Sequence, residues 1–136
     1  MIVRKIDDVT GTKNHVDTPG WYSRRIVTAH DRVGFSVGET VLRAGSVNDF
    51  WYANHVEAVY IVSGEGELYD KDNDRTYELG PGTMYLLDGN EKHQVRVRSD
   101  ITCVCVFNPP IVGTEVHDEN GVYPLLELPP EPAGQA

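Results

Sequence analysis

The chain has 136 residues, the length of one ordinary domain with enough apolar side chains to form its own core. It carries 12 Lys and Arg against 21 Asp and Glu, which gives a formal net charge of -9 at pH 7. This acidic balance opposes binding to phosphate backbones and anionic lipid surfaces, so neither nucleic acid nor a membrane is expected as a partner.

The first residues, 1–8, lack the apolar core of a secretory signal. Further along, no segment approaches the roughly 20 apolar residues that span a bilayer. The two cysteines, Cys103 and Cys105, stand next but one on a predicted strand, where they cannot readily form a disulfide. These features predict a soluble cytoplasmic protein in which both cysteines are small buried side chains.

Glycines recur at short intervals between segments rich in Val, Ile, Thr and Tyr, and no long stretch repeats apolar residues at the helical period of about 3.6. This pattern predicts one all-β domain of short strands over residues 1–128. The polar run 71–74 predicts a hairpin turn, and residues 88–90 predict another. Residues 129–136 are rich in proline with little to bury, which predicts a flexible tail.

Alternation along the strands identifies side chains that point inward. Successive side chains of a strand face opposite sides, so His55, Glu57, Val59 and Ile61 share one apolar face. A carboxylate on such a face is costly unless a cation or hydrogen bonds compensate it. Glu57 is therefore a candidate metal ligand or catalytic group, although an ion pair with an arginine would also satisfy it.

Two further residues become candidates in the same way. His93 shares a face with Val95 and Val97 and is predicted to point inward, although an isolated histidine on an apolar strand can equally be a hydrogen-bonded core residue. Tyr85, taken alone, is a packing aromatic. Near the C-terminal end, residues 101–107 are apolar on both faces, which predicts a strand that is buried on each side.

Two spaced clusters resemble the metal-binding motifs of cupins, in which Glu and His from neighbouring strands meet at one ion. They are residues 57–64 (EAVYIVSG) and 82–93 (GTMYLLDGNEKH). The two histidines that normally precede the glutamate are absent, and residues 50–52 (FWY) stand in their region. The resemblance implies a single jelly-roll β-barrel whose metal site has a changed ligand set.

Longer stretches resemble the ectoine synthase family, namely residues 20–25 (GWYSRR), 54–59 (NHVEAV), 80–88 (GPGTMYLLD) and 105–119 (CVFNPPIVGTEVHDE). The resemblance extends from residue 1 to about residue 124, and its last stretch is highly specific. It implies a hydro-lyase that closes N-γ-acetyl-L-2,4-diaminobutyrate into ectoine, a compatible solute, with loss of water. It also implies an iron-dependent cytoplasmic enzyme that forms head-to-tail homodimers.

Carried over to this sequence, the resemblance assigns the metal ion to Glu57, Tyr85 and His93. Fe2+ is the expected ion, and Zn2+ or Mn2+ could occupy the same mixed nitrogen and oxygen ligands. Gly38 departs from the family pattern, which has a polar side chain at this position. The resemblance further implies that the substrate is contacted by Trp21, Arg25, Thr40, Tyr52, His55, Cys105, Phe107, Glu115 and His117.

Three of these residues are catalytic candidates. Closing the ring requires a polarised amide carbonyl and a deprotonated α-amine, and a metal ion is suited to the first task as a Lewis acid. Tyr52 and His117 are the candidates for proton transfer. Glu115, together with Arg25, is expected to hold the charged ends of the amino acid.

Three rival functions remain open from the sequence. A metal-free cupin that only binds a small acid would need no metal ligands. A cupin dioxygenase would use the same ion for another reaction, although such enzymes generally keep more histidine ligands than a chain with Trp51 and Tyr52 in that region. A cyclase or hydrolase for another N-acetylated amino acid is the third.

Overall fold

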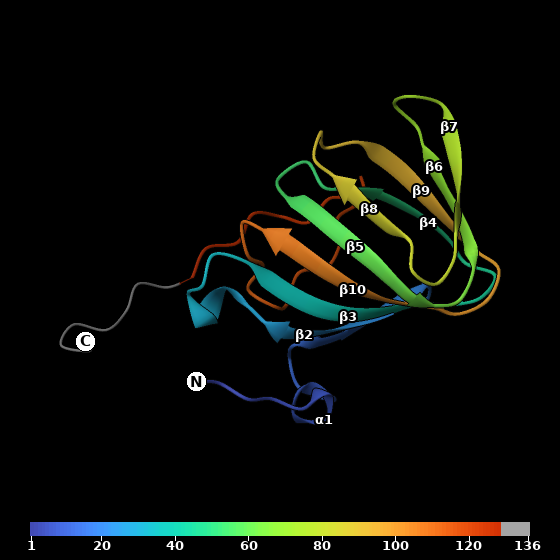
Figure 1. The fold of residues 1–136 in the computed structure, drawn as a ribbon. Coiled ribbons are helices and arrows are strands. Elements are labelled where there is room, and N and C mark those ends of the chain that lie inside the picture. Colours follow the sequence, from blue (N-terminus) through green and yellow to red (C-terminus); the bar gives the residue numbers. More distant parts are fainter. Residues whose placement is uncertain (129–136) are drawn as a thin grey trace.

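The computed structural model describes residues 1–128, and the predicted tail at 129–136 lies outside the described residues. The described part of the chain is mostly β-strand, with one short α-helix and one 3-10 helix (Figure 1). In chain order the elements are α1 (Ile6–Val9), β1 (His15–Asp17), β2 (Trp21–Val27), η1 (Ala29–Asp31), β3 (Ser36–Leu42), β4 (Val47–Trp51), β5 (Val56–Ser63), β6 (Gly66–Asp70), β7 (Arg75–Leu79), β8 (Met84–Leu87), β9 (Lys92–Val97) and β10 (Ile101–Asn108).

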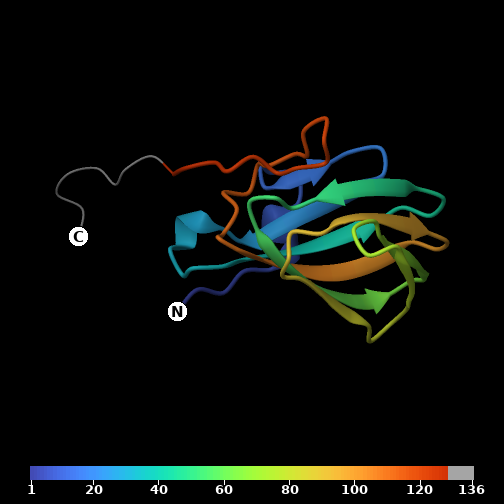
Figure 2. The same ribbon diagram turned by 90° about the horizontal axis from the view of Figure 1, so that it is seen from above.

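The strands form two antiparallel sheets that face each other (Figures 1 and 2). The larger sheet has the order β1-β2-β3-β10-β5-β8, and the smaller has the order β4-β9-β6-β7. The predicted all-β jelly-roll is confirmed. Within residues 1–128 the two sheets remain separate, however, so the barrel is a β-sandwich rather than one closed ring of paired strands.

One predicted hairpin and the predicted inward faces are present. The hairpin predicted at residues 88–90 is wrong, because this segment joins β8 of the larger sheet to β9 of the smaller one. β6 and β7 pair from Gly66 opposite Leu79, and the polar run 71–74 forms the turn between them. The face containing His55 and Glu57 is buried, as predicted from strand alternation. His93 on β9 is buried as well, in the opposite sheet.

The core lies between the sheets, and β10 is central to it because it pairs with both β3 and β5. Its inward residues Ile101, Cys103, Cys105 and Phe107 are buried. The other face of β10 is only partly buried, so the prediction that this strand is covered on each side is wrong for its outer face. Valines are common there because they suit a pleated, half-buried sheet surface.

The turn between β5 and β6 depends on Gly64. Its φ of +90° lies in the region that favours glycine, and a Cβ atom there would collide with the backbone carbonyl oxygen of Asp100. The glycine that ends the first motif is thus needed for local backbone geometry. It lies in the link by which the chain passes from β5 of the larger sheet, which carries Glu57, to β6 of the smaller sheet.

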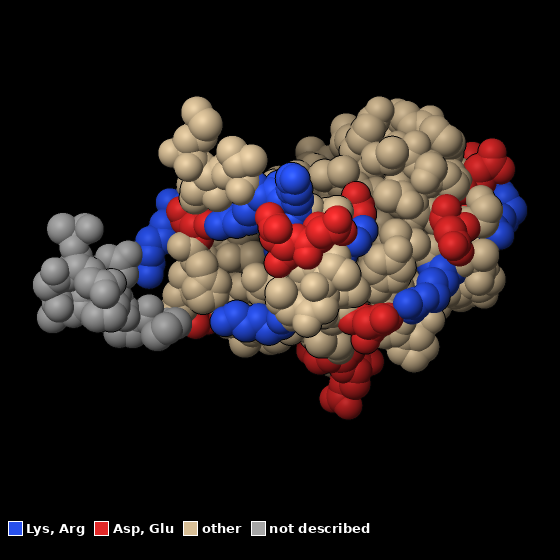
Figure 3. All heavy atoms as spheres, turned by 90° about the horizontal axis from the view of Figure 1, so that it is seen from below, with Lys and Arg blue, Asp and Glu red and all other residues tan. Residues whose placement is uncertain are grey.

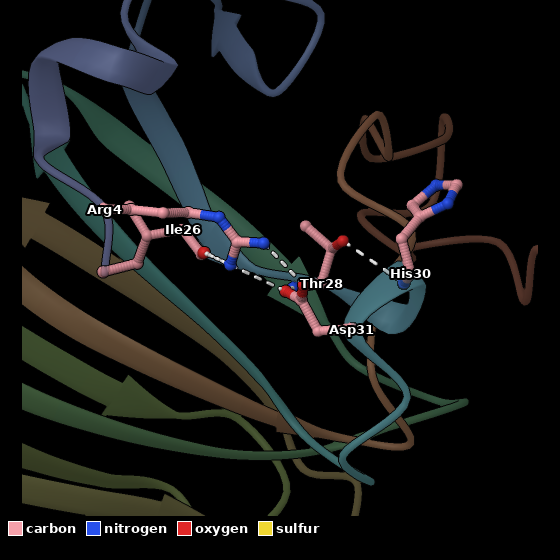
Figure 4. Close-up of polar contacts among 5 residues, drawn as sticks. All are labelled: Arg4, Ile26, Thr28, His30 and Asp31. Atoms are coloured by element: carbon pink, nitrogen blue, oxygen red, sulfur yellow. Dashed lines mark hydrogen bonds and ion pairs between the residues drawn. The ribbon is translucent and has the colours of Figure 1, made fainter. Parts of the chain in front are cut away.

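The N-terminal segment is fastened to the larger sheet by Arg4 (Figure 4). Its guanidinium donates to both carboxylate oxygens of Asp31 at 2.6 and 2.9 Å and to the carbonyl of Ile26 at 2.8 Å. Asp31 also accepts from the backbone N–H of Thr28 at 3.1 Å, which caps the 3-10 helix η1. The hydrogen bond from Arg4 lowers the pKa of the Asp31 carboxyl.

Acidic and basic side chains are interspersed on the lower face of the molecule, beside a broad area without charges (Figure 3). No helix among residues 1–128 is both long and apolar enough to cross a membrane.

Candidate active site

A cavity between the sheets brings together most of the residues predicted to form the site. The predicted residues that line it are Trp21, Arg25, Thr40, Tyr52, Glu57, Tyr85, Cys105, Phe107 and His117. They share the lining with Ser23, Gly38, Leu42, Phe50, Val59, Cys103, Ile111 and Tyr123. Three predicted residues, His55, His93 and Glu115, are buried next to the cavity but outside this lining.

Strand register brings the three predicted metal ligands to one region. On β5, Glu57 faces inward and Val59 follows on the same face, directly opposite Tyr85 of β8. His93 approaches from the smaller sheet, where it pairs with Phe50 of β4. The ring centroids of Tyr85 and His93 are 6.4 Å apart. The candidate ligands therefore come from both sheets of the sandwich.

His93 has the arrangement of a metal-binding imidazole. Its Nδ1 atom lies 3.0 Å from the carbonyl oxygen of Glu91, which can accept a hydrogen only from a protonated Nδ1. The Nε2 atom is buried and has no hydrogen-bond partner within residues 1–128. Burial lowers the pKa of His93, so the imidazole is neutral and Nε2 offers a free lone pair. A backbone carbonyl that fixes the tautomer in this way is typical of histidine ligands.

Glu57 and Tyr85 supply oxygen donors whose charged forms need a cation. Burial raises the pKa of Glu57 well above its ordinary value, with a further contribution from the adjacent Cys105. Burial and then the charge of Glu57 raise the pKa of Tyr85 well above 10. The part of the chain that the structure describes has no cluster of three or more His, Cys, Asp and Glu side chains suited to one ion. The predicted set of Glu57, Tyr85 and His93 is not a cluster of this kind, because it includes a phenol.

The two candidates for proton transfer are in direct contact. The Nε2 atom of His117 lies 3.0 Å from the hydroxyl oxygen of Tyr52. Burial, with the nearby charge of Arg25, lowers the pKa of His117 to about 3. Burial raises the pKa of Tyr52 well above 10. At neutral pH both groups are uncharged, and a hydrogen bond joins the Tyr52 hydroxyl oxygen to Nε2 of His117.

Aromatic rings hold this pair in place. The His117 ring stacks on Tyr123 with centroids 4.1 Å apart and on Phe50 at 4.7 Å, while Trp21 meets it edge-on at 5.2 Å. Tyr52 contacts Phe107 edge-on at 5.1 Å. Such contacts restrict the ring orientations and exclude water from the cavity.

Tyr123 is a site residue that the sequence did not reveal. Its ring packs on His117, and its hydroxyl accepts a hydrogen bond from Nη2 of Arg25 at 2.9 Å. The residue belongs to an irregular segment after β10, where no alternation or spacing distinguishes it. The only available signal was its position just after the highly specific stretch that contains His117.

Arg25 and Glu115 organise the segment that carries His117. The Arg25 guanidinium donates to Ser23 Oγ, to the carbonyls of Gly113 and Glu115, and to the Tyr123 hydroxyl. At most one of its five N–H groups is left for a substrate. Both Glu115 carboxylate oxygens accept backbone N–H groups, from Val112 at 2.8 Å and from Gly113 at 2.9 Å.

The remaining predicted contacts surround the cavity on the larger sheet. Thr40 donates its hydroxyl to Ser23 at 3.1 Å and lies 3.7 Å from the Cys105 sulfur. His55 lies against Phe107 edge-on at 5.6 Å, and its Nδ1 has no partner within residues 1–128. Gly38 lines the cavity without a side chain of its own.

Two facing antiparallel sheets with a cavity between them give this chain the fold of the cupin class. The Cupin_2 domain of an XRE-family transcriptional regulator from Enterobacter cloacae shares this fold, with a TM-score of 0.56 over 67% of this chain and 98% of that one. The two sequences are 18% identical, so this likeness concerns the fold alone.

The family within this class is also established. The family model for ectoine synthase matches residues 1–127. The chain is 57% identical over 129 residues to the L-ectoine synthase of Nocardia farcinica (strain IFM 10152), covering 95% of this chain and 98% of that one. The crystal structure of ectoine synthase from P. lautus matches with a TM-score of 0.83 and 49% identity, covering 100% of this chain and 96% of that one. The chain therefore belongs to the ectoine synthase family, as the sequence resemblance predicted.

Proposed function

We propose that this chain is a hydro-lyase that closes N-γ-acetyl-L-2,4-diaminobutyrate into ectoine with loss of water. The observation that carries the proposal is the cavity, which places a hydrogen-bonded Tyr52 and His117 beside Glu57 and Tyr85. Its enclosure also suits a cyclisation. Folding a flexible substrate on itself brings the amine and the carbonyl together at high effective concentration.

The atoms of the reaction balance without an oxidant or reductant. The α-amine nitrogen forms a bond to the acetyl carbonyl carbon and loses a proton. The former carbonyl oxygen then leaves as water, and the second amine proton is lost as the carbon–nitrogen double bond forms. The two steps need a group that takes up a proton and later returns it.

Tyr52 and His117 can carry that proton. The hydroxyl oxygen of Tyr52 accepts a proton from the amine while its own hydrogen moves to Nε2 of His117, 3.0 Å away. The reverse movement returns a proton to the departing oxygen. His117 is neutral at neutral pH, and in the tautomer that carries its hydrogen on Nδ1 the Nε2 atom is free to receive the hydrogen before each cycle.

The donor set of Glu57, Tyr85 and His93 suits a ferrous ion, with Zn2+ or Mn2+ as substitutes. The support is the buried, unpartnered Nε2 of His93 and the buried carboxyl of Glu57. When bound, such an ion supplies Lewis acidity toward a carbonyl oxygen. Tyr85 takes the position that a histidine ligand holds in other cupins.

The other lining residues bind and enclose the substrate in this proposal. Trp21 and Phe107 form apolar walls, and Thr40 and Cys105 provide polar contacts from the larger sheet. His55 and Glu115 remain proposed contacts, although both are outside the cavity lining. Arg25 has little donor capacity left, so we expect its main effect to come through the segment that carries His117.

The test is to incubate the iron-loaded protein anaerobically with N-γ-acetyl-L-2,4-diaminobutyrate and to detect ectoine by NMR. We expect ectoine to form in the wild type and to be nearly absent with Glu57→Ala. A folded, metal-loaded wild type that gives no ectoine would overturn the proposal. Oxygen uptake, measured in a parallel aerobic assay with the same substrate, would indicate the dioxygenase alternative.

We further propose a cytoplasmic enzyme that supplies a compatible solute under osmotic stress and works as a head-to-tail homodimer. The support for a dimer is apolar surface on β5 and on β8, which is an edge strand, including the exposed side chains of Tyr60, Val62, Met84 and Leu86. Exposed apolar patches of this kind commonly mark protein interfaces. Sedimentation equilibrium of the purified protein tests the oligomeric state.

A further inference from the structure

Two thiols lie side by side in the cavity, and the proposed reaction gives only one of them a contact with the substrate. Cys103 and Cys105 are on the same face of β10, both line the cavity, and both are free. Their sulfur atoms are 3.8 Å apart. Cys103 has no part in the proposed ring closure.

The separation of the sulfur atoms matches that of two ligands on one tetrahedral ion. Zinc–sulfur bonds are about 2.3 Å long, and at a tetrahedral angle two such sulfurs lie roughly 3.8 Å apart. The two thiols therefore need little movement to hold an ion between them. This distance is too long for a sulfur–sulfur bond, which is about 2.05 Å.

The surroundings of the two sulfurs leave room for a small ion. The open space in the cavity is about 30 Å³, and a single water needs at least roughly 10–15 Å³. Oxygen atoms lie close by, since Cys103 is 3.6 Å from the carbonyl oxygen of Thr40 and Cys105 is 3.7 Å from its hydroxyl. Glu57 lines the same cavity. Two sulfurs with neighbouring oxygens and solvent can complete a four-coordinate shell.

We propose that Cys103 and Cys105 form a thiolate pair that binds a thiophilic divalent cation, of which Zn2+ is the natural example, inside the cavity. Each thiol releases its proton to solvent as a sulfur–metal bond forms, and no electron is transferred. Soft thiolate ligands favour Zn2+ over Mg2+ or Mn2+. The bound cation occupies the space of the substrate, so it inhibits the enzyme.

This site differs from the proposed iron site in its ligands. It requires Cys103 and not His93, whereas the iron site requires His93 and not Cys103. Zinc can therefore act on this chain in two ways, by replacing iron or by binding the two thiols. A signal that arises only from thiolate ligands distinguishes these two modes of zinc binding.

The experiment is a titration of the reduced, metal-free full chain with Cd2+, a spectroscopic probe for thiophilic cations, followed by its ultraviolet cadmium–thiolate charge-transfer band. We expect the band to saturate at one cation per chain in the wild type and in His93→Ala. In Cys103→Val we expect most of the band to disappear and the affinity to fall roughly 100-fold, because one of two linked ligands is lost. Zn2+ should displace Cd2+ from the wild type, and Mg2+ should not.

Three results would overturn the proposal: no band in the wild type, an unchanged band and affinity in Cys103→Val, or loss of the band in His93→Ala. Circular dichroism checks the fold of each variant, and Cys103→Ser replaces Cys103→Val if the latter does not fold. Because the readout is cation binding, its outcome does not depend on whether ectoine is formed. In the ectoine assay, zinc inhibition relative to each variant's own rate should weaken in Cys103→Val.

Discussion

Nε2 of His117 lies 3.0 Å from the hydroxyl oxygen of Tyr52, although 65 residues separate them along the chain. Tyr52 follows β4 of the smaller sheet, and His117 belongs to the irregular segment after β10 of the larger one. The contact thus forms only when the sandwich is complete. It joins two groups that are both neutral at neutral pH.

Replacing Tyr52 with phenylalanine tests the role of this pair. The substitution keeps the ring that packs on Phe107 but removes the hydroxyl. We expect kcat to fall by about 10²–10⁴, the usual contribution of a positioned acid or base, while KM changes little. Steady-state kinetics of ectoine formation measure both values.

The matched control is Tyr77→Phe, because Tyr77 is exposed on β7 and outside the cavity lining. It should retain the wild-type rate. A Tyr52→Phe enzyme that works within about threefold of the wild type, well below the usual contribution of an acid or base, would remove Tyr52 from the proton path.

The lowered pKa of His117 predicts how stability depends on pH. As pH falls below the unfolded value of 6.5, the unfolded chain takes up a proton that the folded His117, with a pKa of about 3, does not accept. The free energy of unfolding of the metal-free protein should therefore fall from pH 6.5 toward pH 3. The contribution of His117 to this decrease in the free energy of unfolding approaches about 1.4 kcal/mol per pH unit once the unfolded histidine is mostly protonated.

Urea unfolding of the metal-free protein at pH 7.0 and pH 5.0 measures this dependence. His117→Gln should show a smaller loss between these two pH values than the wild type. His93 and His55, whose pKa values are also lowered by burial, contribute in the same direction and keep some dependence in the variant. Equal losses in wild type and variant would mean that His117 titrates normally in the folded state.

Glu115 has two candidate roles, one structural and one in substrate binding, and a single substitution distinguishes them. Its carboxylate accepts the backbone N–H groups of Val112 and Gly113, and this role predicts that Glu115→Gln lowers stability by about 1–3 kcal/mol with little change in KM. A role in binding the substrate's ammonium group predicts a large rise in KM instead. Urea unfolding and steady-state kinetics on the same preparation distinguish them.

Glu119→Gln is the control for this pair of measurements. Glu119 lies in the same segment and is exposed, so loss of its charge should change neither stability nor KM appreciably. An unchanged stability in Glu115→Gln would show that the hydrogen bonds from Val112 and Gly113 to the Glu115 carboxylate do not stabilise the segment that carries His117.

Strand alternation predicted much of the site, because a period of two residues fixes which side chains face the core. It placed Glu57 and His93 on inward faces, and both are buried. The register between β5 and β8 could not be derived from the sequence, yet it sets Tyr85 opposite Val59. The resemblance to a family, rather than alternation, marked Tyr85 as a ligand, and the ligand set stays a prediction.

The contacts of the irregular segment after β10 could not be predicted from the sequence, and the reason is physical. Its contacts join residues that are far apart in sequence, such as Arg25 with the carbonyls of Gly113 and Glu115. Hydrogen bonds of this kind follow no periodicity. The position of Tyr123 against His117 and the use of the Glu115 carboxylate by backbone N–H groups therefore emerge only from the folded chain.

Metal content provides the most direct check on the proposed ligands. His93→Ala removes the buried Nε2, and Glu57→Gln removes a carboxylate charge, so we expect each variant to retain much less iron than the wild type after desalting. A loss of one ligand or its orienting partner commonly weakens metal binding by about 10–100-fold or more. Elemental analysis of protein reconstituted anaerobically with Fe2+ measures the retained iron, and ectoine formation should fall in parallel.

Tyr85 has a test of its own, because a phenolate bound to ferric iron absorbs visible light through charge transfer. Mild oxidation of the iron-loaded wild type should produce such a band, and Tyr85→Phe should lack it while remaining folded.

His30→Ala is the matched control for the iron content of His93→Ala. His30 lies in the 3-10 helix η1 away from the cavity, so this variant should retain as much iron as the wild type. Normal iron content and turnover in His93→Ala or Glu57→Gln would show that the ion, if one is bound, has other ligands.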